Sequence, residues 1–155
     1  MSLTLADQQA ALVAALAGNG TIPAGFDAAR VRAAADALAF KRARAVAQAW
    51  PSLRTMLGEQ FRDRFAAYAG TTSLPQQGGP LADGRRFARY LAPQMPLTDA
   101  ARLQILAVDL HYRSGAVGLV RRRLPWLGLT WIAQSRRVVI ALGARRYSFG
   151  LSLRR

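Results

Sequence analysis

The sequence predicts an α+β fold, in which a bundle of about five helices is followed by a small antiparallel three-stranded β-meander. Three observations predict this class. Apolar residues recur at helical spacing as far as Leu110, the spacing becomes two-fold after Pro125, and the two patterns do not alternate along the chain. We therefore expect a helical N-terminal domain over residues 1–92 and a second unit, residues 97–155, that holds the last helix and the sheet.

The first two helices are predicted from their capping residues. Thr4 is followed by Asp7, the spacing of a capping box, so a helix of about three turns is expected before Gly20. Asp27 is expected to cap a long helix over residues 28–49. Basic side chains in the C-terminal half of that helix suit the negative end of the helix dipole: Lys41, Arg42 and Arg44.

The strongest helical pattern follows Pro51, which breaks the chain after Trp50 and suits the first position of a new helix. One continuous helix running through Gly58 is predicted, because apolar residues recur there at helical spacing. The stripe expected in the core comprises Leu53, Leu57, Phe61, Phe65 and Tyr68.

Two further helices are expected before the sheet. Residues 70–82 have the composition of a loop, after which Asp83 is predicted to cap a short helix that stops at Pro93. The last helix is predicted to start at Thr98 or Asp99 and to bury its leucines.

Strands are predicted over residues 127–131, 136–142 and 145–153, with a turn at Gln134-Ser135. Leu129 and Ile140 belong to the face expected to be buried, and the other face is expected to be polar and lined by arginine and serine. Trp50 and Trp126 are expected to lie in the core.

Positive charge is concentrated in the second half of the chain. The formal net charge is +14, from 22 basic and 8 acidic residues, and no acidic residue follows Asp109 whereas ten arginines do. Such a region attracts anionic partners, whether nucleic acid, an acidic peptide or an acidic protein surface. Because Lys41 is the only lysine, the arginine bias also fits the composition of a GC-rich genome.

Arginines near the expected strand ends are the candidate binding residues for a peptide or partner. A guanidinium presents a planar set of donors to carboxylate or phosphate oxygens. In the alternative interpretation, the arginines at 121–123 belong to a solvated linker before the sheet. The arginines at 136–137 and 145–146 are then charges that protect strand edges from aggregation. The candidates are Arg121, Arg122, Arg123, Arg136, Arg137, Arg145 and Arg146.

No catalytic, metal or cofactor site is expected. The chain has no cysteine, and one histidine cannot build the usual multi-histidine metal sites. His111 is expected to be structural, and several acids sit at expected helix starts. The sequence therefore predicts a protein that is not an enzyme and that acts by binding.

The start of the sequence has no pattern of an export signal, since Asp7 stands where a signal peptide is basic. The longest nearly apolar stretch, residues 124–133, is shorter than the roughly 20 residues that a membrane-spanning helix needs. We expect a soluble, cytoplasmic protein without a membrane partner.

Residues 41–91 carry a series of motifs in a characteristic order. These are Lys41-Arg42-Ala43-Arg44, Trp50-Pro51-x-Leu53, Leu57-Gly58-x-x-Phe61, Phe65-x-x-Tyr68 and Asp83-Gly84-x-x-Phe87-Ala88-Arg89-x-Leu91. The series resembles bacterial partner proteins of the methanobactin-biosynthesis C type, relatives of which are described as DNA-binding domains. The helical-then-β layout extends the resemblance to most of the chain.

The resemblance implies a function. Such partners form heterodimers with a TIM-barrel, multinuclear non-haem iron oxygenase that modifies a ribosomally made peptide, and they help to bind the leader of that precursor without holding the iron. A basic sheet suits capture of an acidic precursor peptide by strand addition. This chain is shorter and more basic than is usual for that family, so nucleic-acid binding by the arginine surface is the first alternative. A subunit with only an architectural role is the second.

Overall fold

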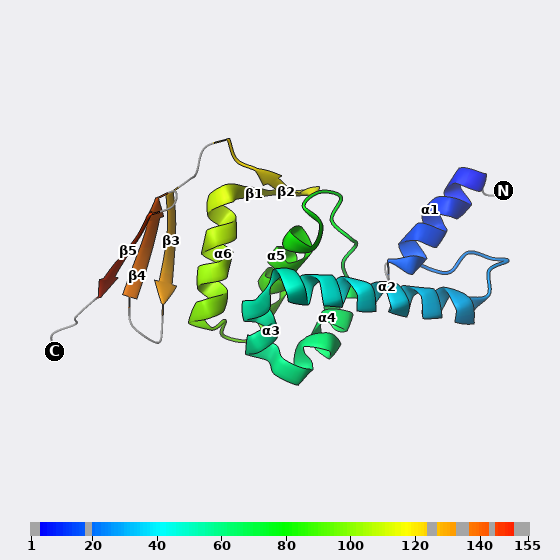
Figure 1. Cartoon of the computed structure of the whole chain (residues 1–155). Helices are drawn as coiled ribbons and strands as arrows, with labels where there is room; N and C mark the ends of the chain where they lie inside the picture. Colours follow the sequence, from blue (N-terminus) through cyan, green and yellow to red (C-terminus); the bar gives the residue numbers. More distant parts are fainter. Residues whose placement is uncertain (1–3, 18–19, 124–126, 133–136, 143–144, 151–155) are drawn as a thin grey trace.

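The computed structural model describes residues 4–17, 20–123, 127–132, 137–142 and 145–150. Helices come first and small antiparallel sheets follow, so the predicted α+β class is confirmed. Figure 1 shows the last helix, α6, standing between the other helices and the sheet of strands β3 to β5.

The first two helices begin where their caps predict. In α1 (Leu5–Leu16) Thr4 and Asp7 form the predicted capping box, with Thr4 Oγ1 accepting from Asp7 N at 3.2 Å. The α2 helix (Ala28–Ala49) begins after Asp27, whose carboxylate accepts from the amides of Ala29 and Arg30. Both predicted N-caps are confirmed.

The predicted single helix after Pro51 is instead two helices. The first, α3 (Pro51–Leu57), ends at Gly58, which has a φ of 53°, and a 3₁₀ turn (Gly58–Gln60) leads into α4 (Phe61–Ala69). Glycine adopts this left-handed conformation without a steric penalty, so the chain bends at this point. The predicted core stripe is nevertheless buried along its whole length, because the bend turns both helices toward the same core.

The α5 helix (Gly79–Leu91) has Gly78 as its N-cap, five residues before the predicted cap, Asp83. Pro80 lies in its first turn, where a missing amide hydrogen costs nothing. Asp83 is therefore not an N-cap, and that prediction was wrong. The α6 helix (Asp99–His111) begins at Asp99, within the predicted choice of Thr98 or Asp99, and the Thr98 hydroxyl accepts from Ala101 N.

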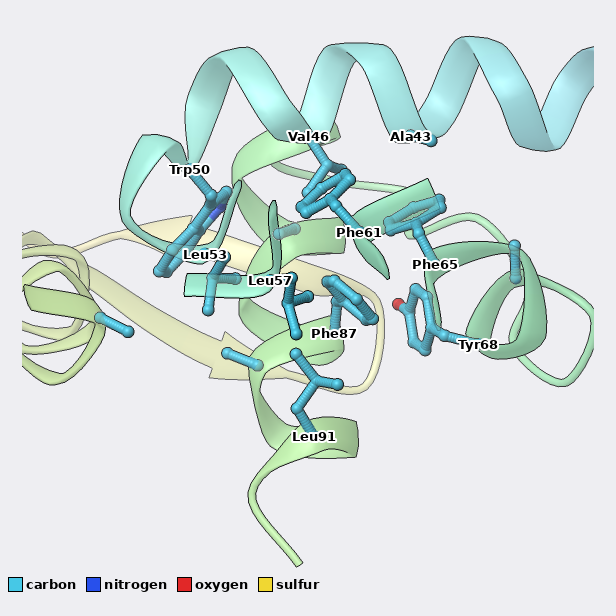
Figure 2. Close-up of a cluster of buried hydrophobic side chains, with 14 of the residues drawn as sticks. Ala43, Val46, Trp50, Leu53, Leu57, Phe61, Phe65, Tyr68, Phe87 and Leu91 are labelled. Carbon is cyan, nitrogen blue, oxygen red and sulfur yellow. The ribbon is translucent and has the colours of Figure 1, made fainter. Parts of the chain in front are cut away.

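An aromatic cluster forms the centre of the helical core (Figure 2). Phe87 of α5 meets Phe61 and Phe65 edge-on, with ring centroids 5.7 and 5.1 Å apart. Trp50 is fully buried, as predicted, whereas Trp126 lies outside the described residues. The same core includes three buried residues of the unit predicted over residues 97–155, namely Ala101, Val108 and Leu119.

A β-hairpin follows α6 that the sequence analysis did not predict. Strands β1 (Tyr112–Gly115) and β2 (Gly118–Arg121) pair antiparallel. Gln77, in the loop before α5, exchanges backbone hydrogen bonds with Val117 and Leu119 and so ties the hairpin to the helical core.

The second sheet contains β3 (Leu127–Ile132), β4 (Arg137–Leu142) and β5 (Arg145–Gly150), with β4 paired to both neighbours. Val139 is buried against Leu106 and Leu110 of α6, whereas Leu129 is 69% exposed. Since successive residues of a strand alternate between faces, the face predicted to be buried is turned away from α6 at Leu129. The leucine stripe of α6 covers the other face. The predicted turn at Gln134-Ser135 lies outside the described residues.

Candidate functional site

The three consecutive arginines at the end of the hairpin differ in their surroundings. Arg121 ends β2 and is exposed, as is Arg123. Arg122 is half-buried, and its Nε lies 3.3 Å from the carbonyl oxygens of both Asp109 and Tyr112. Arg122 thus fastens the end of the hairpin to the end of α6, where the last turn of a helix leaves carbonyl groups to be satisfied.

The backbone register separates the other candidate arginines. Arg137 begins β4 opposite Gly150, whereas Arg145 lies opposite Leu142 and Arg146 opposite Ala141. The β4 strand has six residues, so these positions stand at opposite ends of the sheet, roughly 17 Å apart. Arg136 lies outside the described residues. The ends of the sheet therefore present two separate positive positions.

A cleft between α5 and the β1–β2 hairpin brings together a different set of arginines. We call it the α5–hairpin cleft. Its volume is about 310 Å³, which lies at the lower end of the range of roughly 300–1,000 Å³ typical of ligand pockets. Its lining residues are Ala82, Arg85, Arg86, Arg89, Ser114, Gly115, Gly118 and Leu119.

Arg85 is neutralised within the fold. Its Nε and Nη2 atoms each donate to one carboxylate oxygen of Asp109 at 2.8 Å, a bidentate ion pair that joins α5 to α6. Arg86 donates from Nη2 to the carbonyl oxygen of Ala116 at the hairpin tip, at 2.7 Å. Arg89 is exposed at the rim. Of the residues that line the cleft none is acidic, so it has a positive potential suited to an anion.

These arginines were not among the predicted binding residues, because the helix was predicted to begin after Asp83 and the hairpin was not predicted. A signal was present, however. Arg86 and Arg89 are three residues apart on one helix, a spacing that makes their side chains neighbours.

A buried ion pair holds α5 in place. Arg42 Nε and Nη2 each donate to a carboxylate oxygen of Asp83 at 3.0 Å, and both side chains are almost completely buried. Tyr68 donates to Oδ1 of Asp83 at 2.8 Å, and Arg42 also donates to the carbonyl of Thr72. Burial, followed by the charge of Asp83, raises the pKa of Tyr68 well above its ordinary value. Arg42, noted in the sequence only as a cation suited to the C-terminal half of its helix, is therefore a core residue.

Within the described part of the chain, no group of three or more His, Asp or Glu side chains is placed to hold a metal ion. His111 is exposed at the end of α6, and its Nδ1 lies 2.9 Å from the carbonyl oxygen of Ala107. Among the described helices, none has the length and apolar character needed to cross a membrane.

Comparison with known proteins places the helical region in a family. The UPF0276 protein of Streptomyces avermitilis is 42% identical over 87 residues, which are 56% of this chain and 18% of that protein. No solved structure gives a significant match. The family model described as "SCO6045-like, C-terminal domain" matches residues 6–93. The matched segment contains the core motifs and the arginines of α5, and the chain therefore belongs to the SCO6045-like C-terminal domain family.

Proposed function

We propose that this chain is the non-catalytic partner subunit of an iron-dependent, peptide-modifying oxygenase and that it binds the acidic leader of the precursor peptide. In this proposal the chain has the same role as the methanobactin-biosynthesis C-type partners and forms a cytoplasmic heterodimer with a TIM-barrel oxygenase. One observation carries it. The segment shared with the S. avermitilis protein makes up only 18% of that protein, so in the relative this segment is part of a much longer chain.

Three acidic side chains with structural partners are consistent with a non-catalytic role. Asp27 caps a helix, Asp83 is enclosed by Arg42 and Tyr68, and Asp109 is held by Arg85. Carboxylates held in this way stabilise the fold and are not placed for proton transfer to a substrate. The oxygenase would supply the iron and the chemistry.

The outer face of the second sheet suits the partner protein. In the proposal β3, β4 and β5 act as one three-stranded meander, with Leu129 on the face away from α6 and 69% exposed. Of the register positions on the same face as Leu129, all but the one held by Arg145 at the end of β5 are apolar in the sequence: Leu127, Trp131, Val138, Ile140, Leu142, Tyr147 and Phe149. An apolar face of this kind is typical of a protein–protein interface.

The leader peptide is proposed to bind at the basic end of the same region. The β5 strand is an edge of the sheet and begins with Arg145 and Arg146. Leu127, which opens β3, pairs with Leu142, which pairs with Arg145. Arg145 and Arg146 therefore stand at the end of the sheet where β3 begins, and Arg123 precedes Leu127 by four residues in the sequence. An extended acidic peptide could add to this edge, with the arginines fixing its register.

The partnership is tested by co-purification. The tagged chain is co-expressed with the iron oxygenase encoded nearest to it in its genome, and the variant Leu129→Asp is compared with wild type. The charged side chain should abolish the complex, because it would be desolvated in an apolar interface. Leu74→Asp is the matched control, since Leu74 is also exposed, at 50%, but lies in the loop before α5. Equal recovery of the complex with both variants would contradict the proposed docking face. Failure of the wild-type chain to bind the oxygenase would contradict the function.

A further inference from the structure

We propose that the α5–hairpin cleft is a carboxylate-binding pocket that receives acidic side chains of the bound peptide, with Arg86 and Arg89 as the residues that contact them. The inference rests on the proposed function and adds a site to it. None of the arginines predicted at residues 121–146 lines this cleft.

Arg85, Arg86 and Arg89 all line the cleft but make different contacts, and the difference supports this assignment. Both oxygens of Asp109 are occupied by Arg85, so that pair contributes little net charge to the cleft. Arg86 and Arg89 are offset by no acidic residue in the lining. Arg86 uses Nη2 for the hairpin carbonyl, which holds its guanidinium at the cleft while other N–H groups remain for a ligand. An orientation fixed in advance lowers the entropy cost of binding.

The lining favours a carboxylate on a short aliphatic stem. Ala82 and Leu119 are buried and give the cleft an apolar floor, while Gly115 and Gly118 carry no side chains. The methylene groups of Asp or Glu can contact this floor as their oxygens reach the arginines, and the Ser114 hydroxyl adds a donor. A duplex phosphate backbone, by contrast, presents a long line of charges that a cleft of about 310 Å³ between a helix and a hairpin does not follow.

The test measures binding of a short fluorescent peptide of alternating glutamate and valine to the full chain, with a glutamine–valine peptide as the neutral probe. The variant Arg86→Glu/Arg89→Glu is compared with Arg30→Glu/Arg32→Glu, which makes the same change in net charge on an exposed part of α2 outside the cleft. The cleft variant should weaken binding of the glutamate peptide roughly tenfold or more, because it repels the carboxylate at the point of contact. The control variant should weaken it by no more than about twofold, since exposed distant charges are screened.

A second readout protects the test against unfolding of a variant. On titration of the wild-type chain with the glutamate peptide, the backbone amide resonances of Ser114 and Gly115 should shift, and the glutamine peptide should leave them unchanged. Equal weakening by both double variants, with no shift at the hairpin, would overturn the cleft as the site and leave the proposed function standing. Absence of binding to the wild-type chain would overturn both. Displacement of the glutamate peptide by random duplex DNA would assign the cleft to phosphate and overturn the carboxylate proposal.

Discussion

Arg42 and Asp83 show how far a single residue can depart from its local pattern. Each stands at a position that local rules explain well, one near the end of a helix and the other before an apolar run. The structure pairs them across 41 residues of sequence and buries both. Local patterns cannot reveal such a pair, because they do not show which distant charge faces a given side chain.

The buried pair makes a clear prediction about stability. Asp83→Ala should lower the free energy of unfolding by about 3–5 kcal/mol, because it leaves Arg42 buried without a counterion. Denaturant titration measures the loss. Asp36→Ala, on the exposed face of α2, is the control and should change stability by less than about 0.5 kcal/mol. A small loss for both variants would mean that the pair is solvated.

Tyr68 predicts how stability depends on alkaline pH. Burial and the charge of Asp83 raise its pKa in the folded protein, whereas an unfolded tyrosine titrates near pH 10. Its contribution to stability is therefore complete below about pH 10 and is lost as the pH rises toward the folded value. Urea titrations at increasing pH should show a steeper fall for wild type than for Tyr68→Phe. Parallel curves would contradict the assigned environment.

At the scale of elements, the sequence predicts the helices well and their connections poorly. The stripe from Leu53 to Tyr68 is buried as predicted, because apolar periodicity reports burial. The same periodicity did not reveal the bend at Gly58, because the bend depends on the backbone conformation of a single residue. The hairpin was missed because its strands have only four residues each. In retrospect, Gly115 and Gly118 on either side of a two-residue tip were its signal.

For the candidate site, the sequence predicted only a kind of chemistry, the binding of an anion by arginine side chains. Charge counting indicated that arginines of the second half bind an anion, but the cleft needs α5, the hairpin and the Arg85–Asp109 pair together. Nothing in the local sequence shows that Asp109 neutralises Arg85, or that Arg86 and Arg89 face no acidic residue in the cleft lining. Likewise, alternation predicted the strands, but the face covered by α6 depends on packing against Leu106 and Leu110.

The contact between α2 and α5 gives a prediction at this scale. A Cβ atom on Gly84 would lie 2.1 Å from Cδ1 of the buried Trp50 ring, so Gly84→Ala must push the two helices apart. Overpacking costs about 1–3 kcal/mol, more than the roughly 1 kcal/mol that alanine gains in helix propensity. Thermal unfolding should show a net loss of stability. Gly70→Ala is the control, because its nearest contact would be 3.5 Å away, and it should be close to neutral. Equal melting temperatures for both variants would contradict the close approach.

For the molecule as a whole, salt separates the two classes of anionic partner. Binding to duplex DNA would weaken steeply with salt, with a log–log slope of about −0.9 for each phosphate contacted. A leader peptide held partly by main-chain hydrogen bonds should respond less, since salt screens only the charged contacts. Titrations at several salt concentrations should therefore show a shallow slope for the acidic peptide. A steep slope for DNA with tighter binding than the peptide would favour the nucleic-acid alternative.

The most direct test of the account is reconstitution. The precursor peptide and the iron oxygenase encoded beside this chain are incubated with and without it, and modification of the peptide is followed by mass spectrometry. Modification should occur when the chain is present, little or none should occur when it is omitted, and Arg86→Glu/Arg89→Glu should cause a marked loss. Modification at the same rate in the absence of the chain would contradict the proposed partner role.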